Sequence, residues 1–231
     1  FNKINTLILR AIKSNLQSIL TDCPHREKLG WLEQTYLMGS PVHYNFNIYQ
    51  LYSRQVYNMM EAQLDDGLIP GISPEYVQFT GGFRDSPEWG SAVVIIPWLI
   101  YKWYGDASVM EKAWPTMLRY VEYLKSRSEN HIISYGLGDW FDYGPGQPGV
   151  SQLTPVALTA TAIYYYDLKL MLHMASVLNR SDEQKRLTKW ADEVKSAFKT
   201  HFFDPATCNI STGSQTAMAM PWCIGLVDVQ F

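Results

Sequence analysis

Residues 22–34 gather side chains that could act on a sugar. These 13 residues include three carboxylic acids, an arginine, a histidine and a tryptophan. Hydrolysis of a glycosidic bond needs one carboxylic acid that protonates the leaving oxygen and a second carboxylate for the other half of the reaction. The segment has that inventory. The same letters also fit a polar loop in which Asp22 or Glu27 caps a helix and Arg26 pairs with an acid.

A second candidate segment places a tryptophan beside an acid just before a strongly apolar stretch. Ser86, Pro87 and Glu88 fit an ordinary helix start, with an N-cap, a proline at the first helical position and an acid near the positive end of the helix dipole. That interpretation accounts for Glu88. It leaves unexplained why Trp89 stands beside Gly90 in an early turn.

A third segment joins Asp139 and Trp140 directly after two closely spaced glycines. The glycines do not form a phosphate-binding loop, because no strand precedes them and no Gly-Lys-Ser/Thr follows. A flexible loop that carries Asp-Trp suits a sugar pocket, since the carboxylate accepts hydrogen bonds from hydroxyls while the ring packs on the flat face of the sugar. A tight turn with a packed tryptophan explains the same letters equally well.

Composition excludes several other classes of protein. The 231 residues are 47% hydrophobic, enough for one large domain, and their net charge of -3 comes without a basic stripe, so nucleic acid is not an expected partner. No apolar run reaches the ~18 residues that cross a membrane, so no membrane contact is expected. The three cysteines are widely spaced and the five histidines are scattered, so neither a metal nor a cofactor is expected.

A helical period dominates the chain and predicts an all-α fold. Apolar residues recur at spacings of three and four, as from Met110 to Leu124 and from Leu187 to Phe198. Very short connections alternate with long loops, which indicates stacked antiparallel helix hairpins whose long loops carry the site. Among these loops, Ile132–Tyr135 has an extended pattern. Helices are predicted over residues 2–20, 34–40, 46–64, 88–104, 107–127, 156–179, 182–202 and 214–226.

Taken in order, these segments resemble the bacterial alpha-L-rhamnosidases of glycoside hydrolase family 78, whose catalytic domain is a six-hairpin (α/α)6 barrel. The specific part is Asp-Cys-Pro-x-Arg-Glu-Lys-Leu-Gly-Trp at 22–31. Trp-Gly-x-Ala at 89–92, Gly-Asp-Trp at 138–140 and Ser-Gln-Thr-Ala at 214–217 follow in the family's usual order. The resemblance implies a partial (α/α)6 toroid of antiparallel hairpins, in which the predicted helices are about eight of the twelve in a full barrel.

The resemblance also implies an exo-acting enzyme that removes terminal alpha-L-rhamnose with inversion. Glu27 matches the family's general acid, while Asp22 and Arg26 match positions that bind rhamnose hydroxyls or support the acid. The expected partner is a rhamnose-containing oligosaccharide or glycoside. The other matching positions are expected to form the walls of the sugar pocket: Trp31, Trp89, Asp139 and Trp140.

The chain departs from the family pattern near the expected pocket. Many members have an extra Asp before the Glu of the signature, where Arg26 here abuts Glu27. Members also have Asp three residues after the tryptophan, where this chain has Gln34, and often Asp after Trp-Gly, where it has Ser91. Glu33, one position before Gln34, is a candidate replacement for the missing acid and so a predicted sugar contact.

Residues 1–231 are expected to be one domain, the N-terminal two-thirds of the barrel, truncated at both ends. The chain opens on Phe1 and stops at Phe231. The resemblance places the catalytic base, a Glu close to a Trp, in the last third of the barrel, beyond residue 231. The missing C-terminal part of the barrel is thus an expected partner, and this fragment alone is expected to hydrolyse nothing. Analogy slightly favours a periplasmic or extracellular location over a cytoplasmic one.

Two other functions stay open. Another (α/α)6 carbohydrate-active enzyme, such as an unsaturated-uronyl hydrolase or a lyase, would use basic side chains near a uronate carboxylate, and His25, Arg26 and Lys28 supply them. A catalytically silent sugar-binding domain would bind through its Trp and Asp residues without turnover.

Overall fold

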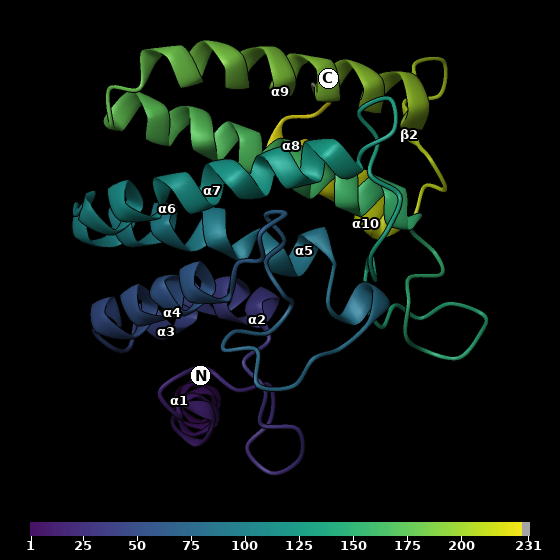
Figure 1. Cartoon of the computed structure of the whole chain (residues 1–231). Coiled ribbons are helices and arrows are strands. Elements are labelled where there is room, and N and C mark those ends of the chain that lie inside the picture. The colour runs from purple at the N-terminus through teal and green to yellow at the C-terminus, as the bar shows by residue number, and fades with distance from the viewer. Residues whose placement is uncertain (228–231) are drawn as a thin grey trace.

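The computed structural model describes residues 1–227, in which antiparallel helices stack in layers (Figure 1). The helices of the first part of the chain are α1 (Asn2–Asn15), α2 (Leu32–Leu37), α3 (Gly39–His43), α4 (Tyr49–Ala62), the 3-10 turn η1 (Gly81–Phe83), α5 (Pro87–Gly90) and α6 (Ala92–Tyr104). Those of the second part are α7 (Ser108–Arg127), α8 (Val156–Val177), α9 (Ser181–Phe202) and α10 (Gln215–Ile224).

Helix α6 lies in the middle of the stack. It contacts α4 on one side and both α7 and α8 on the other, while α8 pairs with α9 in the outer layer (Figure 1). The residues Ala92–Pro97 are all apolar and all buried, because neighbouring helices cover α6 on every side. α6 therefore lies at the centre of the hydrophobic core, and α5 immediately precedes it in the chain.

The three most regular helices match the sequence prediction closely, and so do their connections. Residues 107–127, 156–179 and 182–202 correspond to α7, α8 and α9. Gly105 ends α6 in the left-handed region with a φ of 70°, as a glycine C-cap does. Asp106 follows it and accepts the Ser108 N–H at 2.8 Å, which starts α7.

Three predicted helices differ from the structure at bends. The helix predicted over 2–20 ends at Asn15, because Leu16 is extended and Ser18 has a φ of 70°. The helix predicted over 34–40 is divided into α2 and α3 at Met38. The helix predicted over 88–104 is divided into α5 and α6 at Ser91, whose hydroxyl donates to the buried Asp167 carboxylate at 2.5 Å.

The extended pattern at Ile132–Tyr135 does not produce a strand. This stretch takes part only in an isolated bridge between Glu129 and Ile132. The strands of the described residues lie in a segment predicted to be a loop, where β1 (Phe203–Asp204) pairs antiparallel with β2 (Asn209–Ile210). Two-residue strands carry too little alternation to be read from sequence.

Neither a membrane segment nor a metal cluster is found in residues 1–227. None of their helices has the length and apolarity to cross a bilayer. Their His, Cys, Asp and Glu side chains do not gather in threes as metal ligands.

Candidate functional site

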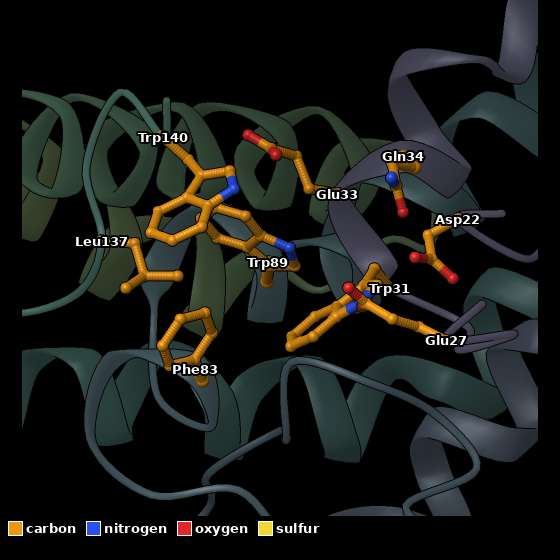
Figure 2. Close-up of a pocket in the computed structure, with 9 residues that line it drawn as sticks. All are labelled: Asp22, Glu27, Trp31, Glu33, Gln34, Phe83, Trp89, Leu137 and Trp140. Carbon is orange, nitrogen blue, oxygen red and sulfur yellow. The ribbon is translucent and has the colours of Figure 1, made fainter. Parts of the chain in front are cut away.

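Side chains from three separate segments line a pocket of about 200 Å³ (Figure 2). In Figure 2, Asp22 and Glu27 lie together beside Trp31, whereas the Glu33 carboxyl lies apart from them, toward Trp140. The pocket thus has two acidic sides. Its lining is contributed by 22–34 (Asp22, Glu27, Trp31, Glu33, Gln34), by the region of α5 (Phe83, Trp89) and by the following long loop (Leu137, Trp140).

The loop that carries Glu27 is closed at its base by Asp22. The Asp22 N–H donates to the Leu29 carbonyl at 2.9 Å, and the Leu29 N–H donates to Asp22 Oδ1 at 2.9 Å. Lys28 adopts a φ of 58°, which turns the chain back toward its start. Asp22 therefore fixes the loop with one carboxylate oxygen.

Cys23 connects the two acids of this side. Its thiol donates to Asp22 Oδ2 at 3.3 Å and accepts the Glu27 N–H at 3.2 Å, which suits a group that is both a weak donor and a weak acceptor. Trp31 Nε1 donates to Glu27 Oε2 at 3.2 Å. Glu27 is therefore held through its backbone and through its side chain, although that side chain remains exposed.

Arg26 lies outside the pocket lining. Its side chain is exposed, as are those of His25 and Lys28 on the same loop. A direct sugar contact by Arg26 remains a prediction that rests on the family resemblance alone.

Glu33 is the pocket carboxyl whose pKa is raised by burial. Burial first, and then the negative charges of Glu88 and Asp139, raise its pKa to about 8. The carboxyl is therefore protonated at neutral pH and can donate a hydrogen bond. Gln34 is exposed at the rim of the same pocket. The structure thus brings Glu33, the predicted replacement for the acid of the family pattern, into the lining.

Glu88 has a larger part in the site than the sequence indicated. It starts α5, as predicted, yet it is only 4% exposed and accepts the Thr159 hydroxyl at 2.7 Å through Oε1. Its Oε2 is buried without a hydrogen-bond partner. Burial, opposed by the Thr159 hydrogen bond, raises the pKa of Glu88 to about 7. One signal in the sequence could have indicated this: no lysine or arginine stands between residues 85 and 101 to pair with Glu88.

Trp89 and Gly90 form one packing unit. Trp89 is 5% exposed and lines the pocket from the short helix α5. A Cβ on Gly90 would collide with the hydroxyl group of Tyr120, so a glycine is required where α5 meets α7. That close approach explains why a glycine follows the tryptophan.

Asp139 and Trp140 lie on a loop fastened at several points. Thr216 in α10 donates its hydroxyl to Asp139 Oδ2 at 2.6 Å. Trp140 lines the pocket and packs edge-on against Phe83 with ring centroids 5.3 Å apart. Asp139 itself lies outside the lining and acts on the pocket through its charge, which contributes to the raised pKa of Glu33.

Comparison with known proteins identifies the fold and the family. The family model of the bacterial alpha-L-rhamnosidase six-hairpin glycosidase domain matches residues 1–230. An alpha-L-rhamnosidase of Formosa agariphila is 27% identical over 229 residues, which are 98% of this chain and 24% of that protein. One of Streptomyces avermitilis is 27% identical over 203 residues, 87% of this chain and 18% of that protein.

Solved structures give the same result. An alpha-L-rhamnosidase from Dictyoglumus thermophilum matches with a TM-score of 0.89 at 30% identity, over 98% of this chain and 26% of that one. The Streptomyces avermitilis enzyme complexed with L-rhamnose matches with a TM-score of 0.87 at 25% identity, over 98% and 21%. The helical stack and its pocket thus define a six-hairpin glycosidase domain. The chain belongs to the bacterial alpha-L-rhamnosidase family, and it spans 18% to 26% of the length of these relatives.

The predicted all-α, partial (α/α)6 toroid is therefore confirmed, and so is the resemblance that the signature at 22–31 carried. The roles of the individual site residues stay predictions. The structure brings most of them to one pocket and leaves Arg26 and Asp139 outside its lining.

Proposed function

We propose that this chain supplies the general acid and the sugar-binding pocket of an exo-acting alpha-L-rhamnosidase. The observation that carries the proposal is the pocket, which combines three acids with three tryptophans in about 200 Å³. Pockets for drug-sized ligands occupy ~300–1,000 Å³, so this one suits a single sugar ring. A one-ring pocket supports removal of a terminal residue. A relative of this chain was crystallised with L-rhamnose, which supports that sugar as the one removed.

Glu27 is the general acid in this proposal. It gives its proton to the glycosidic oxygen while the bond to the rhamnose carbon breaks. Trp31 orients the carboxyl through its hydrogen bond to Oε2, and Cys23 orients the backbone. Arg26, which lies outside the lining, supports the acid from the adjacent position.

The sugar is held by the remaining groups of the pocket. Protonated Glu33 donates a hydrogen bond to a rhamnose hydroxyl, and Asp22 accepts one. Asp139 acts indirectly, since its charge helps to keep the proton on Glu33. The rings of the pocket pack against the apolar face of the sugar: Trp31, Trp89 and Trp140.

The catalytic base is proposed to lie in the part of the barrel that the relatives have beyond the matched quarter. An inverting enzyme needs an ionised carboxylate ~6.5–9.5 Å from the acid, with water between them. Glu33 is a poor base because its pKa of about 8 keeps it protonated at neutral pH. Glu88 is buried and does not line the pocket.

The test uses the full-length protein and a rhamnose-terminated trisaccharide. Glu27→Gln should lower kcat by ~10²–10⁴-fold, the usual contribution of a general acid. Glu61→Gln, in an exposed ion pair with Arg54, is the matched control and should have wild-type activity. NMR of the first product formed should show the β-anomer, as inversion requires.

Other results would exclude the proposal. Full activity of Glu27→Gln contradicts its role as acid, and an α-anomeric first product contradicts inversion. Rhamnose binding without turnover by the wild-type protein would establish a silent binding domain. Turnover of unsaturated uronyl substrates alone would establish another (α/α)6 enzyme, although the basic residues that such an enzyme would use lie outside the pocket lining.

A further inference from the structure

The loop 71–84 borders the pocket on the side of Glu27. The Tyr76 hydroxyl donates to the Lys28 carbonyl at 3.0 Å, which connects this loop to the one that carries the acid. The Phe79 ring packs on Trp31 with centroids 5.2 Å apart and planes inclined by 28°. Trp31 in turn holds the Glu27 carboxyl. Phe79 therefore stands one ring away from the proton donor, yet outside the residues that line the pocket.

The aromatic surface continues from the pocket onto this loop. Phe83 lies 6.1 Å from Phe79 and 6.3 Å from Trp31, measured between ring centroids. Phe83 is 41% exposed although it lines the pocket, and Tyr76 is 61% exposed. The rings of Trp31, Phe83 and Phe79 thus form an aromatic surface that begins in the pocket and continues beyond its lining.

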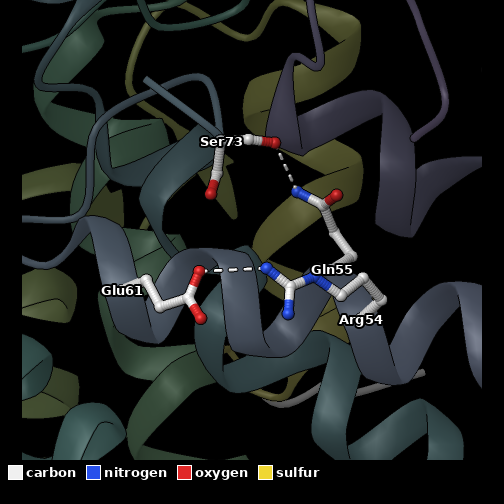
Figure 3. Close-up of polar contacts among 4 residues, drawn as sticks. All are labelled: Arg54, Gln55, Glu61 and Ser73. Atoms are coloured by element: carbon white, nitrogen blue, oxygen red, sulfur yellow. Dashed lines mark hydrogen bonds and ion pairs between the residues drawn. The ribbon is translucent and has the colours of Figure 1, made fainter. Parts of the chain in front are cut away.

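The loop is anchored firmly enough to offer this surface in one geometry. The Gly71 N–H donates to the Arg84 carbonyl at 2.9 Å and closes the base of the loop. Gln55 in α4 donates to the Ser73 carbonyl at 2.9 Å, at a buried position (Figure 3). The Arg84 guanidinium donates hydrogen bonds to both carboxylate oxygens of Glu75, at 2.7 and 3.0 Å. A surface fixed before binding loses less entropy when the ligand arrives.

We propose that Phe79, which extends the pocket-lining rings of Trp31 and Phe83 beyond the pocket, forms a leaving-group subsite for the sugar residue to which the terminal rhamnose is attached. This inference rests on the proposed function and deepens it. The general acid stands between the sugar that is removed and the group that leaves. The leaving sugar therefore lies beyond the one-ring pocket, where Phe79 continues the aromatic surface.

The geometry favours a sugar over a flat aromatic aglycone. The three rings are inclined to one another by 28°, 40° and 53°, so they form a curved surface and no parallel-sided slot. A puckered pyranose ring packs its C–H face on such a surface, where dispersion contacts add up. Its hydroxyls then meet the exposed polar side chains of the adjacent acid loop, Arg26 and Lys28.

The experiment compares Phe79→Ala with wild type in the full-length protein. KM for a rhamnose-terminated trisaccharide should rise about 5- to 10-fold with kcat within twofold, which is the effect of ~1–1.4 kcal/mol of lost binding. The rise for p-nitrophenyl alpha-L-rhamnoside should be smaller, and inhibition by L-rhamnose, which occupies only the pocket, should not change. Phe79→Trp should restore KM. Tyr143→Ala, which removes a 96% exposed ring from another loop, should have no effect.

The proposal is overturned by an unchanged KM for the trisaccharide, or by a rise at least as large for the p-nitrophenyl substrate. Weaker inhibition by L-rhamnose in Phe79→Ala also overturns it, because the ring would then act through the rhamnose pocket. If the wild-type protein releases rhamnose from neither substrate, the proposed function fails. Calorimetry of trisaccharide binding then decides the subsite: weaker binding by Phe79→Ala supports it, and equal binding overturns it.

Discussion

The two acidic sides of the pocket hold carboxyls in opposite environments. On one side, Glu27 is exposed and sits in a loop fastened by backbone amides and a thiol. On the other, Glu33 is largely removed from water beside the negative charges of Glu88 and Asp139. Environment sets the protonation state of identical side chains. In the proposed mechanism, Glu27 gives its proton to the leaving group, whereas Glu33 keeps its proton and binds the sugar.

The largest effect after loss of the acid itself is expected at Glu33. Glu33→Ala should raise KM about tenfold at pH 7, because a pocket hydrogen bond to the sugar is worth ~1–2 kcal/mol. The pH dependence is sharper. Wild-type KM should rise above pH 8 as Glu33 loses the proton that it donates. Glu33→Gln donates at every pH and should have a flat KM between pH 7 and 9. The same rise in Glu33→Gln would contradict the assignment.

Glu88 should make the folded state less stable as the pH rises from acidic to neutral. Its pKa is raised from 4.5 to about 7 in the folded protein, so the stability that it contributes is complete below pH 4.5 and is lost as pH rises through 7. Glu88→Gln should remove that loss. Between pH 5 and 7 the free energy of unfolding, measured by urea titration, should change in favour of the variant by ~2–3 kcal/mol. Glu61→Gln is the exposed control, and an identical change in that variant would disprove the claim.

A substitution at Cys23 should weaken the hydrogen bonds that hold Asp22 and Glu27 without changing either carboxyl group. Cys23→Ala removes the acceptor of the Glu27 N–H and the donor to Asp22, so kcat should fall about threefold, as expected for weak hydrogen bonds. Cys23→Ser keeps both functions and should restore most of the activity. If Cys23→Ala and Cys23→Ser are equally impaired, the thiol matters for packing instead of hydrogen bonding.

The smallest effect is expected at Thr216. Thr216→Val removes the hydroxyl group that donates a hydrogen bond to Asp139, while keeping the shape of the side chain. The less restrained Asp139 should change KM about twofold and leave kcat unaltered. The measurement is a pair of KM profiles over pH 6–9 for wild type and variant. A large fall in kcat would mean that Asp139 takes part in the reaction itself.

Sequence predicted the fold well where the signal is local and repeated. α7, α8 and α9 are long, and each of their turns repeats the same apolar spacing, so their existence followed from that spacing. The bends at Met38 and Ser91 did not follow from it. At Ser91 the break is accompanied by a hydrogen bond to Asp167, which lies 76 residues away in the chain, and no local pattern contains that partner.

The same limit applies to the site. Glu27, Trp31 and Trp140 were predicted as pocket residues because the signature and the Asp-Trp pair are each made of residues close together in the sequence. Glu88 was interpreted as an ordinary helix-start acid because its burial depends on Thr159, 71 residues away. Arg26 shows the opposite case, since a place in the signature did not bring its side chain into the pocket lining.

The division between a proton donor and a neutral binder is tested most directly by leaving-group dependence. The measurement is kcat of Glu27→Gln and Glu33→Gln on p-nitrophenyl alpha-L-rhamnoside and on a rhamnose-terminated trisaccharide. Nitrophenolate leaves readily without a proton, whereas a sugar hydroxyl needs one. Glu27→Gln should therefore lose much more activity on the trisaccharide than on the nitrophenyl substrate, and Glu33→Gln should lose equally little on both. A larger loss on the trisaccharide in Glu33→Gln, with Glu27→Gln equal on both, would contradict the account.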